Sequence, residues 1–208
     1  PIGLLVNNAS RFRHDTATDV SYAGLIEHLL PDLAAPLVLG RELAAALATS
    51  LPESLAASLG DTAADGCDPA SAGPANPGHR GVIVNLLDQK LYSPNPDFLS
   101  YTLSKAALAQ ATVMLAQALA PQVRVVGIAP GLTLPSYLQD EAAFATAHQR
   151  YSPLGRSSTP ADIAATVVFV ADNPAITGSV IVVDGGQHLL GLPRDVSLMP
   201  PRPDPSGQ

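Results

Sequence analysis

Four short runs rich in Val, Ile and Leu constrain the fold of this chain of 208 residues more than any other feature. They lie at 2–6, 81–87, 123–129 and 178–184. Each run is largely apolar and does not alternate with polar residues, which is typical of strands buried on both faces of a parallel sheet. Helical patterns occur between them, near 17–30, 33–49, 100–120, 140–149 and 160–172. This alternation predicts an α/β fold, a doubly wound parallel sheet with helices on both faces.

The pattern predicts a single domain over residues 1–190. Residues 50–80 are rich in Pro, Gly, Ala and Ser with weak periodicity, so we expect a flexible surface excursion there. Residues 191–208 carry many prolines and few apolar anchors, and are expected to be an extended or disordered tail. The chain begins without Met and inside an apolar run, which indicates a truncated N-terminus.

Composition narrows the possible partners. The formal net charge is −7 and no basic block occurs, so nucleic acid and anionic membranes are poor partners. No apolar run approaches the roughly 20 residues of a membrane span. The single cysteine, Cys67, excludes an intrachain disulfide and a cysteine-based zinc site, and no metal site is expected. A cytoplasmic location fits this cysteine usage.

The run YTLSK places Tyr101 four residues before Lys105. On a helix these two side chains share a face. A neighbouring ammonium favours the phenolate, so Lys105 is expected to lower the tyrosine pKa from its usual value of about 10. Such a tyrosine can exchange a proton with a substrate near neutral pH, as a carbonyl or imine reduction requires. Taken alone, the pair also fits an ordinary helix surface.

Polar or Gly-rich residues follow each of the four apolar runs. Ligands bind outside the carboxyl ends of the strands in open parallel sheets, so these residues are expected to meet in one crevice. Any one of them alone also fits an ordinary turn. They are 7–10 (NNAS), Asp88, 130–133 (PGLT) and 184–186 (DGG).

The ordered set LLVNNAS, GVIVNLLD, YTLSKAAL, VRVVGIAPGLT and GSVIVVDGG resembles the short-chain dehydrogenase/reductase family from residue 2 to about 189. The resemblance implies a Rossmann-type fold that binds NAD(P)(H). It implies that Lys105 holds the nicotinamide ribose and tunes Tyr101, the proton donor. The residues it places around the cofactor are Asn7, Asn8, Ala9, Pro130, Gly131, Leu132 and Thr133.

Asp88 stands where the family usually has a serine, thirteen residues before Tyr101. An ionised carboxylate accepts hydrogen bonds but donates none, and it opposes the effect of Lys105 on the tyrosine pKa. The pterin reductases of the family carry Asp at this place, and NNASRF, HQRYSPLGR and AITG-x5-DGG also resemble them. By that resemblance Ser10 approaches the cofactor phosphates and Phe12 stacks on a flat heterocycle. Otherwise Phe12 is a core or loop aromatic and Asp88 a turn residue.

Two further departures from the family concern its cofactor and its proton relay. Asp32 stands where the family often has an Asn that supports a relay water. It could hold a water too, or be a plain polar helix residue near Pro31.

No TG-x3-G-x-G run is present, so the pyrophosphate-binding loop is missing. The segment that selects NAD or NADP is missing too, and the strand at 2–6 is left with an open apolar edge. NADPH is the expected cofactor, with NADH left open.

Three functions are compatible with this sequence. The first is an NADPH-dependent reductase of a C=N bond in a dihydropterin-like substrate, with Tyr101 as proton donor and Asp88 and Phe12 binding the ring. The second is a reductase of a ketone or another carbonyl. The third is a non-catalytic oligomerising fragment that lacks the pyrophosphate loop. The family implies a homo-oligomer, a dimer or tetramer, through the helices at about 33–49 and 100–120.

Overall fold

A computed structural model describes residues 2–49 and 80–199 of the chain. The predicted excursion up to residue 79, including Cys67, lies outside the described residues, as do residues 200–208 of the predicted tail. The elements below therefore belong to these two described segments.

The described strands form one parallel sheet in the order β1-β2-β3-β4. All four predicted strands are confirmed, with end shifts of up to two residues. Their bounds are Leu4–Asn7 for β1, Gly81–Leu86 for β2, Val123–Pro130 for β3 and Val180–Val183 for β4. β2 and the first seven residues of β3 are buried at every position, which explains their mostly apolar sequence. Their two polar side chains, Asn85 and Arg124, are hydrogen-bonded.

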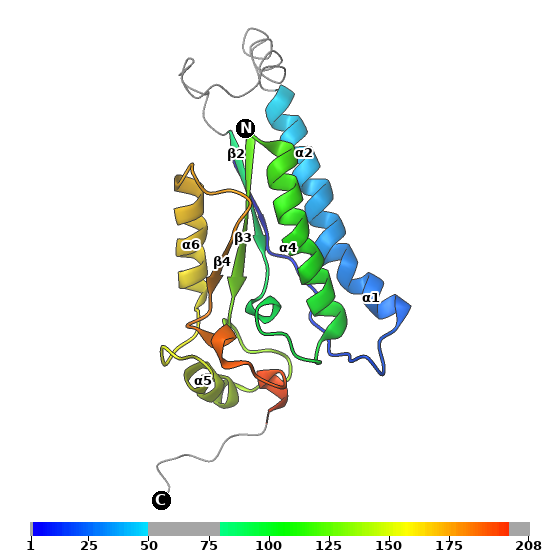
Figure 1. Ribbon diagram of the computed structural model, residues 1–208, viewed down its shortest axis with the longest axis vertical. Coiled ribbons are helices and arrows are strands. Elements are labelled where there is room, and N and C mark those ends of the chain that lie inside the picture. The colour runs from blue at the N-terminus through cyan, green and yellow to red at the C-terminus, as the bar shows by residue number, and fades with distance from the viewer. Residues whose placement is uncertain (1, 50–79, 200–208) are drawn as a thin grey trace, which may run out of the picture.

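One face of the sheet is covered by a long helical pair, α2 (Ala35–Thr49) and α4 (Leu99–Leu119). Leu43 and Leu47 of α2 pack with Ile83 and Val125 of the sheet in one core cluster. A shorter helix, α1 (Tyr22–Leu29), precedes α2 and is joined to it by a π-helical turn at Leu30–Ala34. Figure 1 shows α1, α2 and α4 together on one side of the strands.

The opposite face is covered by α6 (Pro160–Asp172), which Figure 1 shows across the sheet from α4. Val170 of α6 packs with Val84 and Ile128 in a second cluster. The Thr159 side chain and the Asp162 carboxylate form a capping box, as the sequence Thr-Pro-Ala-Asp favours. Helices on both faces confirm the doubly wound α/β fold.

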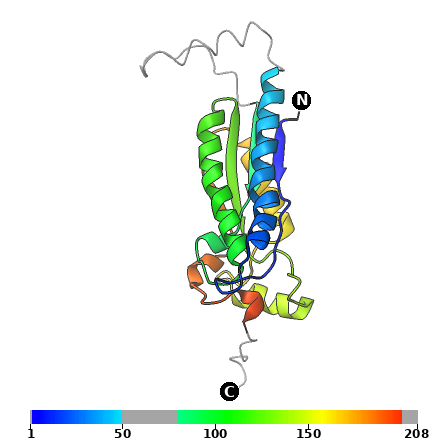
Figure 2. The same cartoon turned by 90° about the vertical axis from the view of Figure 1, so that its right-hand side faces the viewer.

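The remaining elements gather beneath the carboxyl ends of the strands. Figure 2 shows this end of the molecule from the side. It contains α5 (Glu141–Arg150) and three short 3-10 helices, Gln89–Leu91, Gln187–Leu190 and Val196–Leu198.

The predicted extended tail differs from the structure over 191–199. Val196 is buried with Tyr151 and Ala147, and Arg194 pairs with the buried Asp97. Sequence reasoning missed these contacts because each joins residues far apart in the chain.

The helix predicted at 17–30 begins later in the structure, at Tyr22, since Ser21 caps α1 through the amide of Gly24.

The helical stretch Tyr22–Thr49 is long and apolar enough, by length and composition alone, to cross a membrane. Core helices of soluble proteins share these properties, so the finding is weak evidence for a span. Within this stretch, Leu43 and Leu47 are buried against the sheet.

Candidate active site

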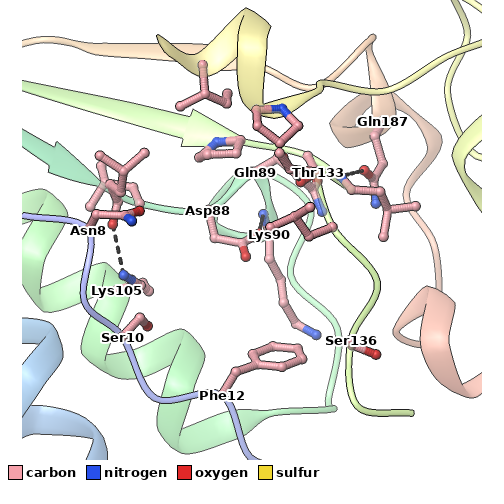
Figure 3. A pocket seen from close by; sticks show the side chains of 18 of the residues that line it. Asn8, Ser10, Phe12, Asp88, Gln89, Lys90, Lys105, Thr133, Ser136 and Gln187 are labelled. Carbon is pink, nitrogen blue, oxygen red and sulfur yellow. Dashed lines mark hydrogen bonds between the residues drawn. The ribbon is translucent and has the colours of Figure 1, made fainter. Parts of the chain in front are cut away.

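A pocket of about 820 Å³ lies at the carboxyl ends of the strands, where open parallel sheets bind ligands. Figure 3 shows the side chains that converge on it. Ten of the residues predicted for the site line this pocket. They are Asn8, Ser10, Phe12, Asp88, Tyr101, Lys105, Pro130, Gly131, Leu132 and Thr133.

Asn7 and Ala9 were also predicted to contact the cofactor, but neither is among the pocket-lining residues. Asn7 is buried, and its side-chain amide donates to Asn85 Oδ1 at 2.7 Å. Asn85 in turn donates to Thr112 Oγ1 at 2.9 Å. Asn7 thus ties β1 through β2 to α4 in this structure, and its contact with a cofactor stays a prediction.

Tyr101 and Asp88 form the centre of the pocket. The Tyr101 hydroxyl donates to Asp88 Oδ2 at 2.8 Å. Asp88 is fixed from its other oxygen, because Oδ1 accepts the backbone N–H of Lys90 at 2.8 Å and so caps the 3-10 helix that follows β2. Asp88 follows β2 and Tyr101 lies in the first turn of α4, thirteen residues later, so this hydrogen bond joins the end of the strand to the start of the helix.

This pairing reverses the predicted effect on Tyr101. Burial raises its pKa well above the usual value, and the negative charge of Asp88 adds to the rise. Lys105 does not offset it, because its ammonium lies 5.8 Å from the centroid of the phenol ring and donates instead to the Leu86 carbonyl at 2.8 Å. The predicted lowering of the tyrosine pKa is therefore wrong for this structure. The opposing effect expected of Asp88 is present.

Burial raises the pKa of Asp88 as well, against the lowering effect of its bonds to Lys90 N–H and Tyr101. Asp88 and Tyr101 are in direct contact, with the tyrosine hydroxyl donating to the carboxylate, which is a suitable arrangement for general acid–base chemistry.

Lys105 is a buried cation at the pocket wall. Burial lowers its pKa, and the nearby carboxylate of Asp32 counteracts this effect. Asp32 is fully buried in the π-helical turn, with Oδ1 3.7 Å from the ammonium and Oδ2 accepting from Ser104 Oγ at 2.8 Å. Asp32 therefore pairs with the charge of Lys105 and is more than a polar residue on a helix surface. Its binding of a relay water stays a prediction.

Phe12 belongs to an aromatic group around Tyr101. Its ring stacks on Phe98 with centroids 4.0 Å apart and meets Tyr101 edge-on at 4.8 Å. Phe98 caps α4 with a left-handed φ of 56°, an uncommon conformation for a non-glycine residue. Phe12 itself lies in the loop after β1, is partly exposed and lines the pocket, so it is a loop aromatic at the site and not a core residue.

The run 130–133 is held in place by β4 and by the 3-10 helix Gln187–Leu190. The Gly131 amide donates to Val183 O at 3.0 Å, and the Leu132 amide donates to Gln187 Oε1 at 3.1 Å. Figure 3 draws the Gln187 bond beside Thr133. A side chain at Gly131 would place Cβ 2.7 Å from Asp184 Cβ, so only glycine allows this close approach.

Sequence reasoning missed Lys90 and Asp195, which also line the pocket. The Lys90 ammonium lies 2.9 Å from Asp195 Oδ2. The one signal available was that Lys90 is the only lysine besides Lys105. Asp195 offered none, since it falls in the predicted tail.

Comparisons with known proteins agree with this geometry. The family model described as enoyl-(acyl carrier protein) reductase, of the short-chain dehydrogenase/reductase family, matches residues 66–188, more than half of the chain. The chain belongs to the short-chain dehydrogenase/reductase family.

Particular relatives cover the chain to different extents. The NADP complex of FolM alternative dihydrofolate reductase 1 from Brucella suis is 38% identical, with a TM-score of 0.72 over 91% of this chain and 65% of that one. Carbonyl reductase family member 4 of Danio rerio is 38% identical over 116 residues, 54% of this chain and 47% of that protein. 3beta-hydroxysteroid dehydrogenase 1 of Eggerthella lenta is 36% identical over 117 residues. The chain thus spans about half the length of the curated relatives it matches.

Proposed function

We propose that the protein is an NADPH-dependent reductase of a C=N bond in a pterin-like ring. The observation that carries this proposal is the 2.8 Å hydrogen bond between Tyr101 and Asp88. A ketone needs one donor beside its oxygen, whereas a nitrogen heterocycle presents both acceptors and N–H donors. A carboxyl beside a tyrosine can serve both, because it accepts when ionised and donates when protonated.

The pocket residues present fit the nicotinamide half of the cofactor. Lys105 keeps spare donor capacity, since an ammonium has three N–H groups, of which one bonds Leu86 O at 2.8 Å while the Asp32 carboxylate lies 3.7 Å away. Asn8, Ser10 and the 130–133 run line the same space. When bound, the nicotinamide supplies the hydride. The FolM structures, which are NADP complexes, support NADPH over NADH.

The chain's own residues handle the proton and the ring. Phe12 offers an aromatic face to a flat heterocycle, while Phe98 supports it from behind. Tyr101 delivers a proton to the ring nitrogen, because its raised pKa keeps the hydroxyl protonated at neutral pH. Asp88, in contact with that hydroxyl, accepts a hydrogen bond from a ring N–H when it is ionised; once it has taken up a proton from solvent, it can pass that proton to the phenolate oxygen. Lys105, whose ammonium lies 5.8 Å from the centroid of the phenol ring, is assigned to the nicotinamide ribose rather than to Tyr101.

The test measures NADPH oxidation with dihydropterin, dihydrofolate and a simple ketone, using the longest form of the protein that its gene encodes. We expect turnover of at least one pterin substrate. Tyr101→Phe is expected to lower kcat by about 10²- to 10⁴-fold, the usual contribution of a general acid. Good turnover of the ketone with none on any pterin contradicts the proposal.

A carbonyl substrate is the second candidate, favoured by the similarity to carbonyl reductase family member 4. Asp88→Ser separates the two. It removes the carboxyl and supplies the hydroxyl donor that suits a carbonyl oxygen, so pterin reduction should fall sharply while ketone reduction is kept or improved.

Assembly into a homo-oligomer through α2 and α4 stays a proposal, to which the exposed Leu103 and Met114 of α4 lend support.

A further inference from the structure

Lys90 is a buried cation that the proposed reaction does not use. Its side chain is only 3% exposed, yet it lines the same pocket as Tyr101. Figure 3 shows it running from beside Asp88 towards Phe12. A buried ammonium is costly unless it is paired and its N–H groups are bonded. Within residues 2–49 and 80–199, Asp195 is its one hydrogen-bond acceptor, so two of its three N–H groups can bond a ligand.

The partner of Lys90 is held rigidly. Asp195 Oδ1 accepts the backbone N–H and the hydroxyl of Ser197, at 3.0 and 2.7 Å. Its own backbone N–H donates to the buried Asp97, which also accepts two bonds from Arg194 at 2.7 and 2.8 Å. Lys90 is therefore fixed from both sides, by the chain after β2 and by the C-terminal segment, and a preorganised donor binds with little ordering cost.

The charges around Lys90 select the kind of group it can bind. Asp195 already balances the ammonium, and Asp88 lies two residues away with its carboxyl in the same pocket. An anionic group would face both carboxylates, whereas an uncharged acceptor would not. The aromatic wall of Phe12 and Phe98 lies alongside, with the ammonium 5.1 Å from the Phe98 ring centroid.

We propose that Lys90 is a specificity-determining residue that donates a hydrogen bond to a ring carbonyl oxygen of a flat, uncharged heterocycle stacked on Phe12. This inference rests on the proposed function, since it names the feature by which the site would choose among nitrogen heterocycles. A ring without the carbonyl would leave the Lys90 donor unused. The site would therefore favour the oxo-substituted ring.

The experiment compares two probes that differ in the oxo group, pterin (2-amino-4-oxopteridine) and 2-aminopteridine. Their Kd values are measured by ligand fluorescence with NADP present, on the longest form of the protein that its gene encodes. Lys90→Met should weaken pterin binding by about 10-fold or more, as expected for loss of a bond from a charged donor. Binding of 2-aminopteridine should change by less than about 2-fold, and Lys90→Arg should keep most of the preference for pterin.

Two controls separate binding from structure. The variant Lys90→Met with Asp195→Asn leaves no unpaired buried carboxylate, so it keeps the test usable if Lys90→Met does not fold. Arg41→Met removes an exposed cation far from the pocket and should alter neither Kd. Equal losses for both probes would give Lys90 a structural role only, and no loss for either would remove it from the site; both results overturn the proposal.

The outcome also separates this inference from the function on which it rests. A wild-type protein that binds neither pteridine and reduces only ketones overturns both. A wild-type protein that reduces dihydropterin, alongside a Lys90→Met variant with unchanged pterin affinity, overturns the Lys90 inference alone.

Discussion

The contact between Tyr101 and Asp88 contributes to the raised pKa of the tyrosine. Burial is the main cause of that rise, and the charge of Asp88 is the next. Asp88→Asn keeps the shape but removes the charge, so the pKa of Tyr101 should fall towards its usual value of about 10 without reaching it. The measurement is an ultraviolet titration of tyrosinate, with Tyr101→Phe subtracted to isolate this residue. An unchanged titration would show that Asp88 does not act on Tyr101 electrostatically.

Asp97 offers a separate test at acid pH. Its pKa is lowered from 3.8 to about 2, chiefly by the side-chain hydrogen bonds from Arg194. The ionised form is therefore favoured in the folded state, so its stabilisation is complete above about pH 4 and is lost as the pH falls towards 2. Asp97→Asn should cost about 1–2 kcal/mol of unfolding free energy at pH 7, allowing for the half-exposed Arg194, and much less near pH 2.

Denaturant unfolding at several pH values measures this difference. Glu42→Gln is the matched control, because Glu42 is an exposed carboxylate paired with Arg41 on the surface of α2. We expect it to change the unfolding free energy by less than about 0.5 kcal/mol at any of these pH values. A loss for Asp97→Asn that does not depend on pH would assign its effect to packing rather than to charge.

Sequence reasoning brought together residues that line one pocket, but it did not predict their interactions. The register of Asp88 with Tyr101 follows from a strand end and a helix start, both of which have local signals. No local signal in the sequence shows where the Lys105 ammonium lies relative to the phenol ring. The predicted shift in the pKa of Tyr101 was therefore of the wrong sign. The Lys90–Asp195 pair spans 105 residues and the Arg194–Asp97 pair 97, so no periodicity could have revealed either.

At the scale of elements, α6 is tied to the sheet by one buried arginine. Arg124 in β3 donates to the carbonyls of Val170, Ala171 and Ile176, at and just beyond the end of α6, with all distances between 2.9 and 3.0 Å. The last carbonyls of a helix have no partner within it, so a buried cation there satisfies them and complements the helix dipole. Arg124→Met should lower the unfolding free energy by about 2–4 kcal/mol.

The other end of α6 provides the matched control for that change. Arg156 pairs with Asp162 at 2.8 Å, but its side chain is 59% exposed. Arg156→Met removes the same charge from a solvated pair and should cost less than about 1 kcal/mol. Denaturant unfolding of both variants measures the contrast. Equal costs would mean that the buried bonds of Arg124 contribute no more than a surface ion pair.

The elements themselves were largely predictable because their signals are local. Largely apolar runs gave the four strands, and Thr-Pro-Ala-Asp gave the start of α6. The sequence pattern predicted two separate helices, 17–30 and 33–49. In the structure a π-helical turn around Pro31 joins them, since the proline interrupts the hydrogen bonding without ending the helix. The contacts of 191–199 depend on tertiary structure and were not predictable from composition.

At the scale of the whole molecule, β1 is the edge of the described sheet. Its side chains Leu4 and Val6 are 40% and 38% exposed, and an apolar edge strand is a site of aggregation. Leu4→Lys should slow aggregation at high protein concentration, with a change in unfolding free energy within about 1 kcal/mol. Light scattering measures this. Leu5→Lys is the control: Leu5 packs against the core, so this variant should destabilise the fold and aggregate faster.

A second feature of the whole chain is the lack of a pyrophosphate-binding motif in its sequence. The residues proposed to hold the nicotinamide and its ribose line the pocket, but no G-x-G-x-x-G or TG-x3-G-x-G run occurs in the 208 residues to bind the pyrophosphate. Backbone N–H groups at a helix N-terminus normally supply much of that binding. Calorimetric titration of this 208-residue chain with NADPH should therefore give weak or undetectable binding, while nicotinamide mononucleotide should bind about equally well. Lys105→Met should weaken any residual binding of both ligands. A micromolar Kd for NADPH would mean that the described pocket binds the dinucleotide without that loop, and would remove the main support for a non-catalytic fragment.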